Sequence, residues 1–99
     1  MMDRPDIDRL EWDVWNLEHI GKHSVSPEEA EEVVFGDAIW HDSYKFRRVA
    51  TGPTLGGRML TVIIGETPGK SGSYHVFSAR PSSRHERRDY REKQEGRRP

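Results

Sequence analysis

The sequence contains no cysteine among its 99 residues. This excludes disulfide bonds and thiolate metal sites, and it fits a reducing compartment. Long hydrophobic runs are absent too, because the longest one, Val62 to Ile64, is far too short to span a bilayer. The first residues lack the basic start and apolar stretch of a signal peptide. We therefore expect a cytoplasmic protein that does not associate with a membrane.

The chain is poor in hydrophobic residues, which make up 32% of it, against 33% charged residues. Its Trp, Ile and Val residues nevertheless occur in clusters, which argues against disorder throughout. A chain of this length can bury only one modest core. We therefore expect a single domain over residues 1–99, with frayed termini at about residues 1–6 and 96–99.

The net charge of −1 hides a strong asymmetry along the chain. Residues 1–44 include 12 acidic and 3 basic residues, a net charge of −9, whereas residues 45–99 include 13 basic and 5 acidic residues, a net charge of +8. Basic residues concentrated in one part of a small domain are typical of proteins that bind a polyanion. The alternative is that the two halves neutralise each other across the fold.

Two helices are predicted near the N-terminus, after a short alternating strand at Ile7–Trp12. Asp13 can cap the first helix, which we expect to end near His23. Ser26, with Pro and Glu residues in the following turn, forms a capping box that opens a second helix ending near Phe35. The predicted buried stripes are Val14, Leu17 and Ile20 on the first helix and Ala30, Val33 and Val34 on the second.

Three strands follow at short spacing, over Phe46–Thr51, Arg58–Glu66 and Ser73–Arg80. The Gly- and Pro-rich connections between them favour a meander of antiparallel hairpins in which the middle strand is central. The preceding segment Ala38–Tyr44 fits either an edge strand or an irregular crossing. We therefore predict an α+β fold, a small antiparallel sheet with two N-terminal helices and one C-terminal helix packed on it.

The C-terminal helix is predicted to open at a second capping box, Ser83 with Glu86, and to run to about Gln94. Its first turns are rich in arginine, which suits a phosphate backbone. Acidic residues of the same helix could instead pair with these arginines at i,i+3 and i,i+4 as an ordinary solvated face. The candidate RNA-binding residues are Arg84, Arg87, Arg88 and Arg91.

The last hairpin suggests a phosphate cradle. If its strands pair about a turn near Gly69, Arg58 faces Arg80. Adjacent guanidinium groups repel each other unless an anion joins them, and the N-terminus of the following helix adds a positive dipole end. The alternative is that each arginine pairs with a carboxylate from the acidic half.

The stretch EHIGKH (18–23) places two histidines four residues apart. A zinc-protease helix needs a Glu between its histidines, whereas this chain has Ile, Gly and Lys there. No other histidine stands at a spacing typical of a third ligand. We therefore predict no metal and no cofactor, with His19 packed beside Trp15 on a half-exposed helix face.

Four segments carry a resemblance to a known family: LEWD (10–13), KHSVSPEEAEEV (22–33), GRMLTVI (57–63) and FSARPSSRHERRDY (77–90). Their order and approximate spacing resemble those of the BrnT family of type II toxins, and the last segment is the most specific. The resemblance covers about residues 10–91. It implies a RelE-like fold, metal-independent endoribonuclease activity that inhibits translation, and a BrnA-like ribbon-helix-helix antitoxin whose complex with the toxin binds operator DNA.

The resemblance also implies a catalytic site. Two arginines would hold the phosphate while the RNA 2′-OH attacks it, and the other members are candidates for acid and base. The first helix reads Val14-Trp15-Asn16 where many members carry a Lys, and Ser24 stands where they have Gly. The alternative is therefore a catalytically inactive interaction module that binds an antitoxin or operator DNA. The implied catalytic residues are Lys22, His23, Arg58, Arg80, Glu86 and Tyr90.

Overall fold

The computed structural model of the protein describes residues 4–96. The fraying predicted for residues 1–3 and 97–99 concerns positions outside this range. Residues 4–6 form no helix or strand, whereas Gly96 is the last residue of a helix.

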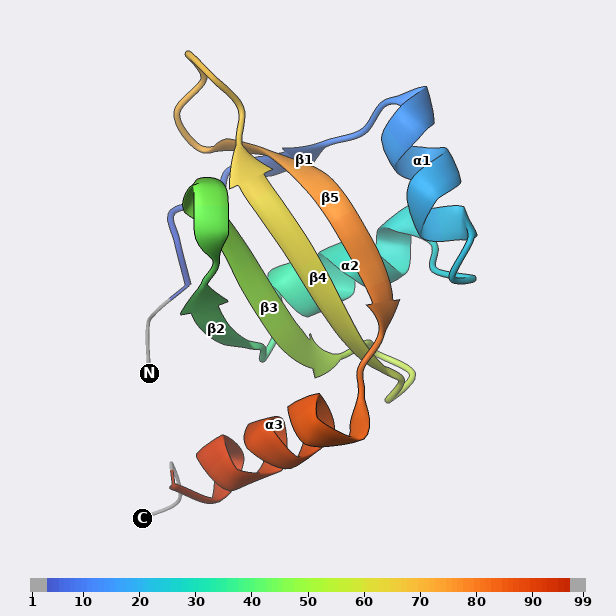
Figure 1. The fold of residues 1–99 in the computed structure, drawn as a ribbon, viewed down its shortest axis with the longest axis vertical. Coiled ribbons are helices and arrows are strands. Elements are labelled where there is room, and N and C mark those ends of the chain that lie inside the picture. Colours follow the sequence, from blue (N-terminus) through green and yellow to red (C-terminus); the bar gives the residue numbers. More distant parts are fainter. Residues whose placement is uncertain (1–3, 97–99) are drawn as a thin grey trace.

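The predicted order of elements is confirmed, and the ambiguous segment after the second helix is an edge strand (Figure 1). One turn of 3-10 helix, η1 (Tyr44–Phe46), joins this strand to the next. The helices are α1 (Val14–Gly21), α2 (Pro27–Val34) and α3 (Arg84–Gly96). The strands are β1 (Arg9–Glu11), β2 (Ile39–Asp42), β3 (Arg47–Pro53), β4 (Met59–Glu66) and β5 (Ser73–Pro81).

The sheet has the strand order β1-β5-β4-β3-β2. Strands β2 to β5 form the expected antiparallel meander with β4 at its centre. The prediction of a purely antiparallel sheet is wrong, because β1 runs parallel to β5 and pairs Arg9 with Ser73. A three-residue strand carries no signal of its partner, since alternation reports burial and not pairing direction.

The core lies between the sheet and the helices α1 and α2, and Figure 1 shows α2 behind the sheet and α1 beside β5. Alternate residues of β4, namely Leu60, Val62 and Ile64, are fully buried there because successive strand residues point to opposite faces. Ser26 and Glu29 form the predicted capping box of α2. The predicted stripe of this helix, Ala30, Val33 and Val34, is fully buried.

Helix α1 is capped by Asp13 as predicted, but its buried face differs from the prediction. Asn16 and Ile20 are buried, whereas Val14 is 70% and Leu17 41% exposed. The Asn16 side-chain amide donates to the carbonyl of Val76 at 2.6 Å, beyond the part of β5 that β1 covers. This polar anchor sets the rotation of the helix, and a hydrophobic pattern cannot detect it.

Helix α3 opens at the predicted capping box, in which the Ser83 N–H donates to Glu86 at 2.8 Å and the Glu86 N–H donates to Ser83 Oγ at 3.2 Å. The layout of this helix differs from the prediction, because it contacts the sheet at β3 and none of its residues is fully buried. Figure 1 shows it beyond the ends of β3 and β5. Tyr90 is its one large apolar side chain, so the helix has no apolar stripe to bury.

Candidate functional site

The face of the sheet opposite α1 and α2, here called the open face, has polar side chains at the end where β5 leads into α3. Thr61 lies between the core residues of β4, so its side chain points to this face. Its hydroxyl lies 3.2 Å from that of Thr51 and 2.9 Å from that of Ser82. Arg80 pairs with Thr61 across the hairpin, so its side chain is on the open face too.

Arg80 is held by Glu86 in a two-point ion pair. Its two terminal nitrogens donate to the two carboxylate oxygens at 2.7 and 2.8 Å. The Arg80 guanidinium lowers the pKa of Glu86 to about 2, with help from the Ser83 N–H and the Thr61 hydroxyl and against the effect of burial. A carboxylate with so low a pKa is a weak base, so the geometry suits Glu86 for orienting Arg80.

The predicted register of this hairpin is wrong, because Arg80 faces Thr61 and not Arg58. Next to the turn, Gly65 pairs with His75, which centres the turn one residue later than predicted. An irregularity between Ile63 and Ile64 then shifts the pairing by one further residue. Turn position and bulges depend on backbone conformation, which the hydrophobic pattern did not reveal.

Arg58 instead binds the connection between α1 and α2. Its guanidinium donates to the carbonyl oxygens of Ser24 at 2.7 Å and His23 at 3.2 Å, and it pairs with Glu29 at 3.2 Å. The Ser26 N–H and then Arg58 lower the pKa of Glu29. Arg58 therefore fixes the turn that carries Lys22, and the side chains of Lys22 and His23 are left exposed.

Five of the six implied catalytic residues fall into two groups. Lys22, His23 and Arg58 cluster around the α1–α2 turn, while Arg80 and Glu86 lie on the open face. Tyr90 belongs to neither group, because its hydroxyl donates to the Asp37 carbonyl at 2.8 Å and ties α3 to the segment before β2.

The four arginines of α3 share one exposed face, since they stand at positions i, i+3, i+4 and i+7. Arg87 also donates to the Ser82 carbonyl at 2.6 Å, next to Arg80. Within residues 4–96, no ion pair joins any of the four to a carboxylate. We call this set the arginine stripe: Arg84, Arg87, Arg88 and Arg91.

Part of the charge asymmetry is neutralised inside the fold. Among residues 4–96, three ion pairs join the acidic half to the basic half, and a fourth, Arg80–Glu86, lies within the basic half. None of these four pairs includes a residue of the arginine stripe, so the stripe is a positively charged surface. The pairs between the halves are Asp42–Arg48, Glu29–Arg58 and Lys70–Glu11.

The two histidines of EHIGKH do not share a helix face, because α1 ends at Gly21 before His23 is reached. His19 stacks on Trp15 with ring centroids 4.8 Å apart, as the sequence predicted. In residues 4–96 no three His, Asp or Glu side chains are grouped to hold a metal ion. No helix in that range is long and apolar enough to cross a membrane.

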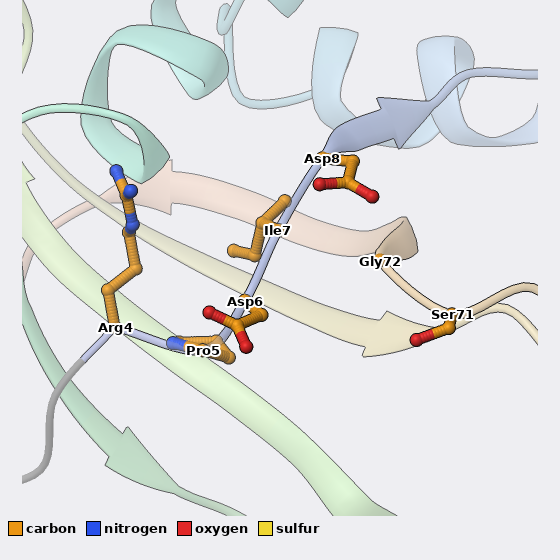
Figure 2. A pocket seen from close by; sticks show the side chains of 7 residues that line it. All are labelled: Arg4, Pro5, Asp6, Ile7, Asp8, Ser71 and Gly72. Atoms are coloured by element: carbon orange, nitrogen blue, oxygen red, sulfur yellow. The ribbon is translucent and has the colours of Figure 1, made fainter.

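A depression of about 370 Å³ lies at the other end of the sheet, between the segment before β1 and the β4–β5 turn (Figure 2). Its polar side chains are those of Arg4, Asp6, Asp8 and Ser71, and the Asp8 and Arg9 N–H groups donate to the Gly72 carbonyl. It holds none of the implied catalytic residues, and its two carboxylates make it a poor site for a phosphate.

Neither a scan against models of known protein families nor a search of curated proteins finds a match for this chain. The candidate site therefore rests on the geometry described above. Sequence reasoning missed the hydroxyl ladder of Thr51, Thr61 and Ser82, whose only signal was a threonine inside the apolar strand MLTVII. It also missed Asn16, a polar residue within an otherwise apolar helix start.

Proposed function

We propose that this protein is an RNA-cleaving toxin of a type II toxin–antitoxin pair, similar to the BrnT family and independent of metal. The observation that carries the proposal is Arg80, held by Glu86 beside the arginine stripe. Glu86 occupies one edge of the guanidinium, and the Arg80 side chain remains 37% exposed. A guanidinium oriented in this way is suited to donate its remaining N–H groups to a phosphate.

The chemistry follows from this placement. The stripe would bind the RNA backbone by charge, and Arg80 would stabilise the phosphoryl oxygens as the 2′-OH attacks. Glu86 acts as the positioning residue for Arg80 and not as the base, because its pKa is about 2. His23 and Lys22 remain the acid and base candidates, since both are exposed on a turn that Arg58 fixes.

One further structural feature agrees with the resemblance. Ser24 stands where BrnT-like proteins have Gly, and its φ of +57° is in the left-handed region that favours glycine. The backbone at this turn therefore has the conformation that the family's residue choice implies. A BrnA-like ribbon-helix-helix antitoxin would cover the arginine stripe with acidic or apolar side chains, and operator DNA would be contacted through that complex.

A second candidate function is a binding module without catalysis, which would dock an antitoxin or operator DNA. The division of the implied site favours it, because Arg58 holds the turn of Lys22 and His23 whereas Glu86 holds Arg80. The two functions differ in one outcome. A ribonuclease inhibits growth when expressed alone and degrades RNA as a purified protein, whereas a binding module does neither.

The test is RNA degradation by purified protein with and without EDTA. We expect cleavage that EDTA leaves unchanged, because the described chain has no grouped metal ligands and the sequence has no cysteine. Arg9→Ala, an exposed arginine on β1, is the matched control for the arginine variants. Loss of cleavage on chelation, restored by added zinc, would contradict the metal-independent mechanism.

A further inference from the structure

A cluster of aromatic and basic side chains lies where η1 meets the open face, at the far end of β3 from Thr51. Phe46 is 95% and Tyr44 67% exposed. Lys45 stands between them, with its ammonium 5.8 Å from the Tyr44 ring centre. Exposed aromatic rings that alternate with cations are typical of surfaces that bind single-stranded nucleic acid.

The cluster is built into the sheet. Gly65 leaves room for the Phe77 ring, because a Cβ there would lie 2.5 Å from a ring atom of Phe77. The Arg47 guanidinium lies 4.0 Å from the Phe77 ring centre and 5.4 Å from that of Tyr44. The Phe77 ring therefore packs on β4 at Gly65, the Arg47 guanidinium lies over the Phe77 ring, and the exposed Tyr44 ring lies next to that guanidinium.

The turn holds Phe46 outward at a conformational cost. Lys45 and Phe46 have φ angles of +58° and +61°, a left-handed conformation that non-glycine residues rarely adopt in succession. The Ser43 N–H donates to the Arg47 carbonyl at 2.8 Å and closes the turn. Strain of this kind is concentrated at binding sites, because surrounding structure must maintain it. A depression of about 410 Å³ lies beside the Phe46 ring. Its lining residues are Asp42, Ser43, Lys45, Phe46 and Arg48.

We propose that Tyr44 and Phe46 form a base-stacking subsite for single-stranded RNA, separate from the phosphate site at Arg80. Arg47 and Thr51 are on the same face of β3, four residues apart, which is about 13 Å of strand. Thr51 is aligned through Thr61 with Arg80. One short RNA segment on the open face can therefore reach both sites. The inference rests on the proposed RNA binding and adds the recognition of bases to it.

The test is binding of a mixed-sequence single-stranded RNA whose 2′-O-methyl groups prevent cleavage, measured by fluorescence anisotropy. We expect Phe46→Ala and Tyr44→Ala each to weaken binding by about tenfold, because stacking on a protein ring contributes substantially per base. Both side chains are exposed, so both variants should fold, which circular dichroism checks. The matched control is Trp15→Ala, which removes a 58%-exposed aromatic from α1 and should leave affinity unchanged.

An abasic RNA of the same length completes the experiment. We expect wild type and the two variants to bind it equally, because it offers phosphates without bases. Full affinity for the base-bearing RNA in both variants, while Arg80→Ala weakens binding, would overturn the stacking subsite and leave the proposed function intact. Failure of the wild type to cleave unmodified RNA of the same sequence would refute the ribonuclease, and weaker binding of the protected RNA by the two variants would still support the subsite. Loss of antitoxin affinity alone would identify the rings as a protein anchor and overturn the inference.

Discussion

The two faces of the sheet differ in what covers them and in what their side chains can do. On the covered face, Leu60, Val62 and Ile64 pack under α1 and α2 and are completely buried. On the open face, the alternate positions of the same strand include Thr61, whose hydroxyl bonds to neighbouring hydroxyls near the Arg80–Glu86 pair. One strand therefore serves stability with one set of residues and the candidate site with the other.

Arg58 and Arg80 also differ in what their side chains can do, although both are arginines paired with a glutamate. Each pairs with a glutamate in a capping box, Glu29 for Arg58 and Glu86 for Arg80. Arg58 also donates to two backbone carbonyls and so holds the α1–α2 turn. Among the described residues, Arg80 has, besides Glu86, a long 3.4 Å contact with the Pro81 carbonyl, so its other N–H groups are available to a ligand.

Removal of the Arg80 guanidinium should give the largest effect on activity. We expect Arg80→Ala to reduce RNA cleavage at least about 100-fold, because one charged donor at a developing phosphoryl charge contributes on that scale. Cleavage assays with circular dichroism as a folding check measure this, and Arg9→Ala should keep wild-type activity. A folded Arg80→Ala protein that cleaves at the wild-type rate would remove Arg80 from the site.

Adjacent isoleucines of β4 allow the two faces to be compared with one chemical change. Ile64 is fully buried on the covered face, whereas Ile63 is half-buried on the open face. We expect Ile64→Ala to lower the free energy of unfolding by about 2–5 kcal/mol and Ile63→Ala by about 1 kcal/mol. Urea unfolding measures both values. Equal losses would mean that the open face is as tightly packed as the core.

The low pKa of Glu86 predicts that the free energy of unfolding depends on pH. Its pKa of about 2 lies below the ordinary 4.5, so its ion pair adds stability above the unfolded-state pKa and loses it as the pH falls from about 5 to about 2. We expect Glu86→Gln to lower the free energy of unfolding by about 1–2 kcal/mol at pH 7, a value reduced for solvent exposure. Unfolding curves at pH 7 and pH 2.5 should show this difference shrink. A constant difference would contradict the assigned ion pair.

The exposed side of α1 should give the smallest effect. Val14 is 70% exposed, so we expect Val14→Ala to change the free energy of unfolding by less than about 0.5 kcal/mol. Ile20→Ala, at a residue 1% exposed on the same helix, should cost about 2–4 kcal/mol. Thermal or urea unfolding compares them. A large loss of unfolding free energy in Val14→Ala would instead support the buried stripe that the sequence pattern predicted.

Local signals in the sequence were sufficient for most elements of the fold. Both capping boxes, Ser26 with Glu29 and Ser83 with Glu86, start helices where predicted, because their hydrogen bonds involve residues only three positions apart. The three meander strands and the α2 stripe followed from periodicity. The same reasoning failed for α1, where the Asn16 bond to Val76 spans 60 residues and is invisible in a local window.

The candidate site could be predicted only as a list of residue types. The four arginines of α3 share a face by helical spacing alone, so the sequence determined the arginine stripe. The alternative that Arg58 pairs with a carboxylate of the acidic half is confirmed by Glu29, whereas Arg80 pairs with Glu86 of the basic half. The pairing of the two strands could not be inferred, because it depends on the turn position and on the irregularity at Ile63 and Ile64. Any shift changes which side chains meet across a strand pair, and a shift of an odd number of residues also moves them to the other face of the sheet.

By itself, then, the sequence determined an α+β meander, its helix starts, its central strand and the uneven distribution of charge, since all of these depend on neighbouring residues. Only the tertiary structure decided the parallel pairing of β1 with β5, the separation of Arg58 from Arg80 onto different partners, and the meeting of Arg47 with Phe77 beside η1. Apart from Arg80 with Glu86, these contacts join residues distant in the chain, and strand register and backbone conformation fix such contacts.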